Sequence, residues 1–189
     1  MRRPTLQPTL WRTCRALANA RRLRILQRVS RDGGGTVSQI AARCGLAVPK
    51  TSEGLRRLQS RGLLRAERVS RWVRYEAGAD ASVVHAAPIL AAVQAAFLRR
   101  EAPAGMLQEL TAFTHPRRLL LLAALAEAPQ TQAELARRCG LSRTAAARHL
   151  GKLARRRLVA LAARGACTLA PHPPPLAADL LHVLRPPSA

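Results

Sequence analysis

The chain has 189 residues, which is enough for one large domain or two small ones with buried cores. Its formal net charge of +22 indicates a polyanionic partner, with nucleic acid as the first expectation and an anionic membrane surface as the second. Four widely spaced cysteines without a Cys-x-x-Cys pair exclude a zinc ribbon and a disulfide scaffold, and no apolar run reaches the ~18–20 residues that cross a bilayer. No apolar region follows the N-terminal arginines as in a secretory signal, so we expect a cytoplasmic protein with no membrane partner.

The first elements are two short helices. Apolar residues at helical spacing over residues 6–17 predict a first helix from about Pro8. Asn19 is a favourable N-cap for a second helix, whose apolar positions lie within residues 23–29. The three consecutive glycines of residues 33–35 end this helix, because glycine does not hold a helical conformation well.

A helix-turn-helix pattern follows. Thr36 and Gln39 form a capping box that opens a third helix, and Gly45 ends it. A fourth helix is predicted from about Val48 through Ser60, with a proline tolerated in its first turn. Two helices joined by a short glycine turn are typical of helix-turn-helix proteins, in which the later helix is the recognition helix.

Residues 63–76 change to a two-residue period, which predicts a two-stranded β-ribbon with its turn near Ser70 and Arg71. We expect Val73 and Tyr75 to pack this wing onto the helices. Trp72 is either a packing aromatic, which we favour, or an exposed contact for a partner.

An apolar helix is predicted next, over residues 81–100, and its scarcity of charges indicates burial on more than one face or packing against a partner helix. The whole pattern then repeats. Residues 39–46 (QIAARCGL) return 95 positions later as residues 134–141 (ELARRCGL), and His115 takes the helix-start position of Asn19. Such an internal repeat decides the fold.

The second copy predicts the same elements in the same order. It has a capping box at residues 131–134, a recognition helix N-capped by Ser142, a wing over residues 158–170 and a last helix over residues 175–184. The predicted fold class is therefore mainly α with small β-wings, as two tandem winged helix-turn-helix domains.

The domains are expected at residues 1–100, which include the long helix, and at residues 101–189. Two fused copies allow an intramolecular pseudo-dimer. A homodimer of chains through the helix at residues 81–100 is the alternative arrangement.

Two stretches resemble the ArsR-type winged helix-turn-helix regulators. Residues 17–26 (LANARRLRIL) look like the opening of that family's second helix, and residues 141–150 (LSRTAAARHL) look like its recognition helix. The resemblance implies a dimeric fold joined by its first and last helices, with recognition helices in the major groove and wings on the DNA backbone. The Cys-containing box with which many such proteins sense metals is not present here, so we expect no metal and no other cofactor.

Double-stranded DNA is thus the expected partner, and the candidate contacts lie on both recognition helices and both wings. Arginine on a recognition helix can fork onto guanine, whereas arginine on a wing contacts phosphate or the minor groove. In the first half the candidates are Val48, Pro49, Lys50, Ser52, Arg56, Arg57, Arg68 and Arg71. In the second half they are Arg143, Thr144, Arg148, His149, Lys152 and Arg164. Residues 1–100 carry a formal charge of +15 and residues 101–189 carry +7, so we expect the first half to bind phosphates more strongly.

Cys44 and Cys139 each end the first helix of a helix-turn-helix pair, where a small apolar side chain is needed. Core packing is the favoured interpretation, and a redox or metal sensor beside an arginine is the alternative. The sequence contains no pair of carboxylates, no nucleophile with a base and no phosphate-binding glycine loop, so we expect no enzyme.

The sequence therefore predicts a sequence-specific DNA-binding transcriptional regulator, and specifically a repressor, without naming a small-molecule effector. The alternative is a tandem winged-helix protein that mediates protein interactions or DNA architecture without regulatory sequence specificity.

Overall fold

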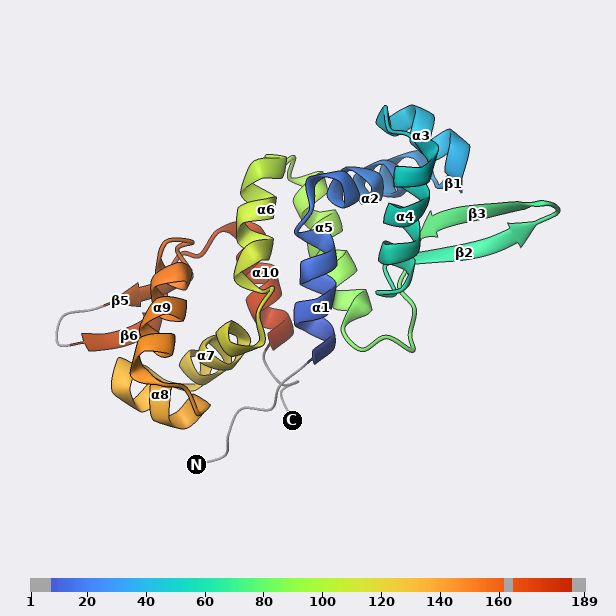
Figure 1. The fold of residues 1–189 in the computed structure, drawn as a ribbon. Helices are drawn as coiled ribbons and strands as arrows, with labels where there is room; N and C mark the ends of the chain where they lie inside the picture. The colour runs from blue at the N-terminus through green and yellow to red at the C-terminus, as the bar shows by residue number, and fades with distance from the viewer. Residues whose placement is uncertain (1–7, 162–164, 185–189) are drawn as a thin grey trace.

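The computed structural model describes residues 8–161 and 165–184, and they form two copies of one winged helix-turn-helix unit (Figure 1). The first unit consists of α1 (Pro8–Leu17), α2 (Ala20–Asp32), β1 (Gly35–Thr36), α3 (Val37–Cys44), α4 (Val48–Gln59), β2 (Leu64–Val69), β3 (Trp72–Ala77) and α5 (Ala86–Leu98). The second unit consists of α6 (Pro103–Ala112), α7 (Pro116–Glu127), β4 (Gln130–Thr131), α8 (Gln132–Cys139), α9 (Arg143–Ala154), β5 (Val159–Leu161), β6 (Ala166–Leu169) and α10 (Pro175–Leu184). The predicted fold class is confirmed.

The caps that the sequence predicts are present. The side chain of Asn19 accepts a hydrogen bond from the backbone N–H of Arg22 at the start of α2. Both capping boxes form, at Thr36 for α3 and at Thr131 for α8. The helix α3 ends at Gly45 in the left-handed conformation, with φ of 60°, which glycine adopts without steric cost. Local sequence therefore fixes where α2, α3 and α8 begin, and Ser142 caps α9, whereas α4 begins after Ala47 without a side-chain cap.

Each unit has a three-stranded antiparallel sheet, with the order β1-β3-β2 in the first and β4-β6-β5 in the second. The short strands β1 and β4 were not predicted, because a strand of two residues is too short to show an alternation of apolar and polar residues. In the first wing Val69 pairs with Trp72, so the turn lies at Ser70–Arg71 as predicted. Tyr75 is buried and packs the base of the wing onto the helices, also as predicted.

One predicted helix boundary is wrong. The helix expected over residues 81–100 begins only at Ala86, because a start at residue 81 would place Pro88 in the helix interior without an N–H to donate. With α5 starting at Ala86, Pro88 falls in the first turn, where no donor is needed. The second unit then begins with α6 at Pro103.

The two units share one hydrophobic core. Helix α1 packs against its counterpart α6, and α5 packs against its counterpart α10. Buried residues of both units, such as Leu17, Val93, Phe113 and Leu180, belong to a single contiguous cluster. An interface in which each element meets its own counterpart is the isologous arrangement of a twofold dimer, here made within one chain.

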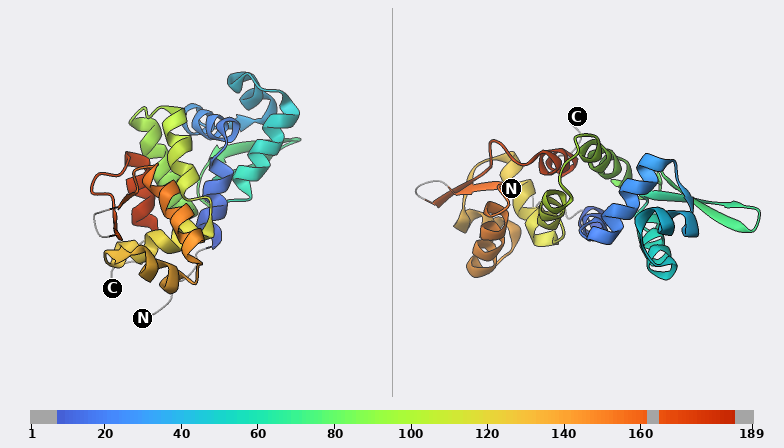
Figure 2. Two further views of the ribbon diagram at one scale, coloured as in Figure 1. Left: turned by 60° about the vertical axis from the view of Figure 1, so that its left-hand side comes forward. Right: turned by 90° about the horizontal axis from the view of Figure 1, so that it is seen from above.

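This shared core places both recognition helices on the same side of the molecule. Figure 2 (right) shows α4 and α9 along one long edge, with the two wings extending from opposite ends. Helices α1, α5, α6 and α10 lie between them (Figure 1). One chain therefore presents two helix-turn-helix units in the same direction.

Candidate nucleic-acid interface

Helix α4 exposes the residues that the sequence predicts as DNA contacts. Its buried face consists of Thr51, Gly54, Leu55 and Leu58, which pack toward α2 and α3. The candidates on the other face are exposed, except for the half-buried Ser52; they are Val48, Pro49, Lys50, Arg56 and Arg57. The first unit therefore has a solvent-facing recognition helix with two arginines near its C-terminal end.

Gly54 explains how closely α4 lies to α2. A Cβ atom added at Gly54 would be 2.6 Å from Cδ1 of Ile25, closer than two carbon atoms can lie. Glycine at this position lets the recognition helix lie directly on the second helix. The sequence alone presented Gly54 only as a departure from the ArsR-type pattern.

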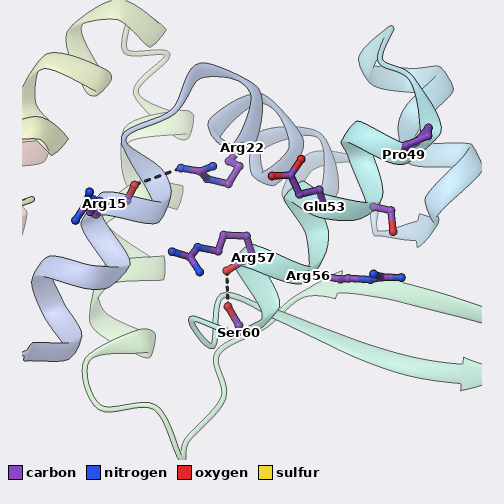
Figure 3. A pocket seen from close by; sticks show the side chains of 8 residues that line it. Arg15, Arg22, Pro49, Glu53, Arg56, Arg57 and Ser60 are labelled. Carbon is purple, nitrogen blue, oxygen red and sulfur yellow. Dashed lines mark hydrogen bonds between the residues drawn. The ribbon is translucent and has the colours of Figure 1, made fainter.

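A cleft of about 850 Å³ separates the outer face of α4 from the α1–α2 corner (Figure 3). Arg15 of α1, Arg22 of α2 and Arg57 of α4 line it, and Arg57 points from α4 toward α1 whereas Arg56 points the other way. Glu53 also lines the cleft. Among the described residues, none of these four arginines forms an ion pair with a carboxylate.

The positive charges in the cleft are held close together. The guanidinium of Arg22 donates hydrogen bonds to the carbonyls of Arg15, at 3.3 Å, and Ala16 at the end of α1. Burial lowers the pKa of Arg22, and the nearby charge of Arg57 lowers it further. Ser60 donates to the carbonyl of Arg57 at 3.0 Å. A cleft with this charge and no paired carboxylate suits the phosphate of a nucleic acid.

Arg15 and Arg22 are therefore two candidate contacts that sequence reasoning missed. They lie on α1 and α2, outside the helix-turn-helix pair. The sequence places them on either side of the turn at Asn19, but only the packing of α1 and α2 beside α4 brings them to the recognition helix.

Two side chains of the first wing that we expected to pack onto the helices are exposed. Trp72 is 54% exposed and Val73 is 41% exposed, so neither packs the ribbon onto the helices. The wing extends beyond the helices here, and no core is available to either face (Figure 1). The alternative reading of Trp72 as an exposed contact is the one that the structure favours.

Arg68 and Arg71 lie at the exposed tip of this wing. The guanidinium carbon of Arg71 lies 5.3 Å from the ring centroid of Trp72, a cation–π contact. Arg74 is instead held at the wing base, since it donates to the carbonyl of Gly33 at 2.9 Å and pairs with Glu76 at 3.0 Å. Unlike Arg74, Arg68 and Arg71 thus have no ion pair among the described residues.

The second recognition helix, α9, exposes three of its candidates, Arg143, Thr144 and Arg148. Ser142 caps the helix by accepting from the N–H of Ala145 at 3.2 Å. Lys152 is half-buried farther along α9. Arg164 lies outside the described residues.

The prediction of His149 as a DNA contact is wrong. Its side chain is 3% exposed and lies against the ring of His115, with the ring centroids 4.6 Å apart. Among the described residues, neither ring nitrogen of His149 has a hydrogen-bond partner. Burial, followed by the charge of the neighbouring His115, lowers the pKa of His149 to about 4. A neutral, buried imidazole packs the helix and does not reach a base.

The two repeated cysteines pack rather than react. Cys44 is 4% exposed, and Cys139 is half-buried against the same core. Burial raises the pKa of Cys44, and raises that of Cys139 to about 11, so both thiols are protonated at neutral pH. Within residues 8–161 and 165–184, no group of three His, Cys, Asp or Glu side chains could hold a metal ion.

Comparison with known protein families identifies both helix-turn-helix units. Residues 18–68 match the IclR helix-turn-helix domain, and residues 114–166 match the MarR family. No curated protein matches the chain. In the described residues, no helix is long and apolar enough to span a membrane. The matches indicate a DNA-binding transcriptional regulator and do not single out the ArsR type.

Proposed function

We propose that this tandem of two winged helix-turn-helix units is a sequence-specific regulator that binds double-stranded DNA as one chain. The observation that carries the proposal is that α4 and α9 lie on the same side of one shared core. Two recognition helices of a twofold dimer enter successive major grooves about one helical turn, ~34 Å, apart. The chain is thus the covalent equivalent of such a dimer.

We place the domain division near residue 100 as part of this proposal; the end of α5 at Leu98 and the start of α6 at Pro103 support it. The pairs α1–α6 and α5–α10 take the place of the interface between two subunits. From the ArsR-type resemblance we carry over only the docking mode, with recognition helices in the major groove and wings on the backbone.

The two recognition helices differ at their exposed positions, so we propose a site with two unlike halves. Lys50 and Arg56 lie on α4, whereas Arg143 and Arg148 lie on α9. Unlike side chains prefer unlike base edges, because each base pair has its own donor and acceptor pattern in the major groove. The preferred DNA need not be palindromic.

Repression is the regulatory direction that we favour, because a protein covering two adjacent half-sites blocks other proteins from that DNA. The place of action is then the cytoplasm, where we expect that DNA to lie. We propose that the chain acts by binding DNA and not as an enzyme.

Selection of bound duplexes from a random pool tests the proposal. A single asymmetric motif supports the pseudo-dimer, and a palindrome supports a homodimer of chains, which light scattering would detect as twice the chain mass. Recovery of no motif supports the alternative, a DNA-architectural or protein-interaction module.

Binding measured against salt tests whether DNA is the partner at all. With six or more phosphate contacts, affinity for a duplex falls by roughly 10³-fold or more between 50 and 200 mM salt. No duplex binding at low salt would contradict the proposed function.

A further inference from the structure

The tip of the first wing gathers exposed apolar side chains. Of the seven large apolar residues that are exposed in the described part of the chain, Val69, Trp72 and Val73 lie on this one hairpin. Their exposed fractions are 50%, 54% and 41%, respectively. Large exposed apolar groups concentrated at one place mark a contact surface.

The strand register places Trp72 and Val69 together. Val69 pairs with Trp72 directly beside the two-residue turn, so both side chains lie on one face of the ribbon. Val73 pairs with Arg68, and this pair lies on the opposite face. The aromatic ring and its cross-strand valine therefore form one apolar tip, distinct from the face of Val73.

The charges around this tip identify the chemistry of the partner. The guanidinium of Arg71 lies over the Trp72 ring, and Arg68 is on the same hairpin. An apolar wedge flanked by cations fits the minor groove of DNA, where phosphates line both edges and base pairs form the floor. The hairpin projects outward beyond α4, in the direction that a duplex along the recognition helices would follow (Figure 1).

We propose that Trp72, supported by Val69, inserts into the minor groove beside the first half-site and wedges apart one base step, which kinks the DNA. This inference rests on the proposed DNA binding and adds a residue that deforms the duplex. Residues 158–170, the second wing, contain no aromatic residue, so the kink forms on one side only. The preferred step is pyrimidine–purine, such as TA, because these steps unstack most easily.

The test uses the full chain carrying Trp11→Phe, which leaves Trp72 as its single tryptophan. The probes are 30-base-pair duplexes at low salt, identical except for a TA or a GC step beside the first half-site. Quenching of Trp72 fluorescence reports stacking on bases, and energy transfer between dyes on the two DNA ends reports bending. Trp72→Ala and Val69→Thr are compared with Val73→Thr, the matched control on the opposite face.

The expected results separate the two faces of the hairpin. Trp72 is quenched on binding and the TA duplex bends more than the GC duplex. Trp72→Ala abolishes the bend and weakens binding by about 5- to 30-fold, the effect of losing one aromatic–base stack. Val69→Thr reduces the bend, whereas Val73→Thr leaves both bend and affinity unchanged.

Three outcomes would overturn the wedge. The first is a bound duplex that stays straight while Trp72 remains unquenched, which leaves the proposed DNA binding intact. The second is an equal effect of Trp72→Ala and Val73→Thr. The third is loss of self-association in Trp72→Ala with unchanged DNA affinity, which would make the tip a protein contact. No duplex binding by the parent protein would instead contradict the proposed function as well.

Discussion

The imidazole of His149 on α9 lies against the imidazole of His115, the N-cap of α7, with ring centroids 4.6 Å apart. In the first unit the corresponding positions are Gly54 and Asn19. The second unit thus has a tilted pair of imidazole rings at the place where α4 of the first unit closely approaches α2. Both rings are held neutral by burial, which lowers the pKa of each histidine.

This relationship predicts a loss of stability in acid. Folding lowers the pKa of His149 from 6.5 to about 4, so below pH 6.5 the unfolded chain binds a proton that the folded chain does not. The contribution of His149 is full above pH 6.5 and is lost as pH falls toward 4. We expect the free energy of unfolding to drop by on the order of 1–3 kcal/mol from this residue between pH 7.5 and pH 4.5.

Urea denaturation at both pH values measures this drop, with the variant His149→Leu as the comparison. The variant cannot bind a proton at this site. The midpoint of its urea unfolding should therefore change less with pH than that of the parent protein. His182→Gln, at an exposed position of α10, is the control and should behave like the parent. Equal pH dependence in His149→Leu and the parent would contradict the assignment.

His149 also shows where the sequence misleads. Its place in the family-like Arg-His-Leu string suggested a base contact, yet Ala146, Leu150 and Leu153 are buried on the same stripe of α9. Helical spacing alone puts residue 149 between these positions, on the inner face. Here the helical periodicity predicted the orientation of His149 better than the resemblance did.

Caps, turns and buried helix faces were predictable because they depend on residues a few positions apart. The exposure of Trp72 and Val73 was not, because alternation does not tell how far a ribbon extends beyond the helices that could cover it. The cleft of Arg15 and Arg57 depends on the angle between helices distant in sequence. The helices and strands could therefore be predicted from the sequence, whereas packing decides which side chains they bring together.

Gly54 is predicted to be required for the close packing of α4. The substitution Gly54→Ala places a methyl group 2.6 Å from Cδ1 of Ile25, and we expect destabilisation of about 1–3 kcal/mol. Ile25→Val removes that Cδ1 atom, so the double variant should recover part of the loss. Gly151→Ala in α9 is the control, since no atom lies within 4 Å of its added Cβ, and it should stabilise the protein by roughly 0.5–1 kcal/mol.

Thermal and urea unfolding of the parent protein, the two single variants, the double variant and the Gly151→Ala control give these free energies. Additive effects of Gly54→Ala and Ile25→Val, with no coupling between them, would show that α4 and α2 do not make this contact.

The arginine cleft beside α4 is predicted to hold a DNA phosphate. Arg15→Ala should weaken binding to all duplexes and reduce the slope of log K against log salt by about 1, as expected for one lost phosphate contact. Arg21→Ala is the matched control, because Arg21 is an exposed arginine beside Arg22 that does not line the cleft. Fluorescence anisotropy with a labelled duplex at several salt concentrations measures both slopes. Equal slopes of log K against log salt in the two variants would show that the cleft does not contact DNA.

Arg56 and Arg71 are predicted to act differently, because one is on the recognition helix and the other at the tip of the wing. Arg56 is exposed on α4, where a guanidinium can fork onto guanine, so Arg56→Ala should cost about 1–3 kcal/mol on the preferred duplex and little on others. Arg71→Ala should weaken all duplexes by a similar factor, because contacts to phosphate carry no sequence information. Affinities for the selected duplex and for single-base variants of it measure the difference. If both variants weaken every duplex alike, α4 does not read bases through Arg56, and the protein binds DNA as an architectural module.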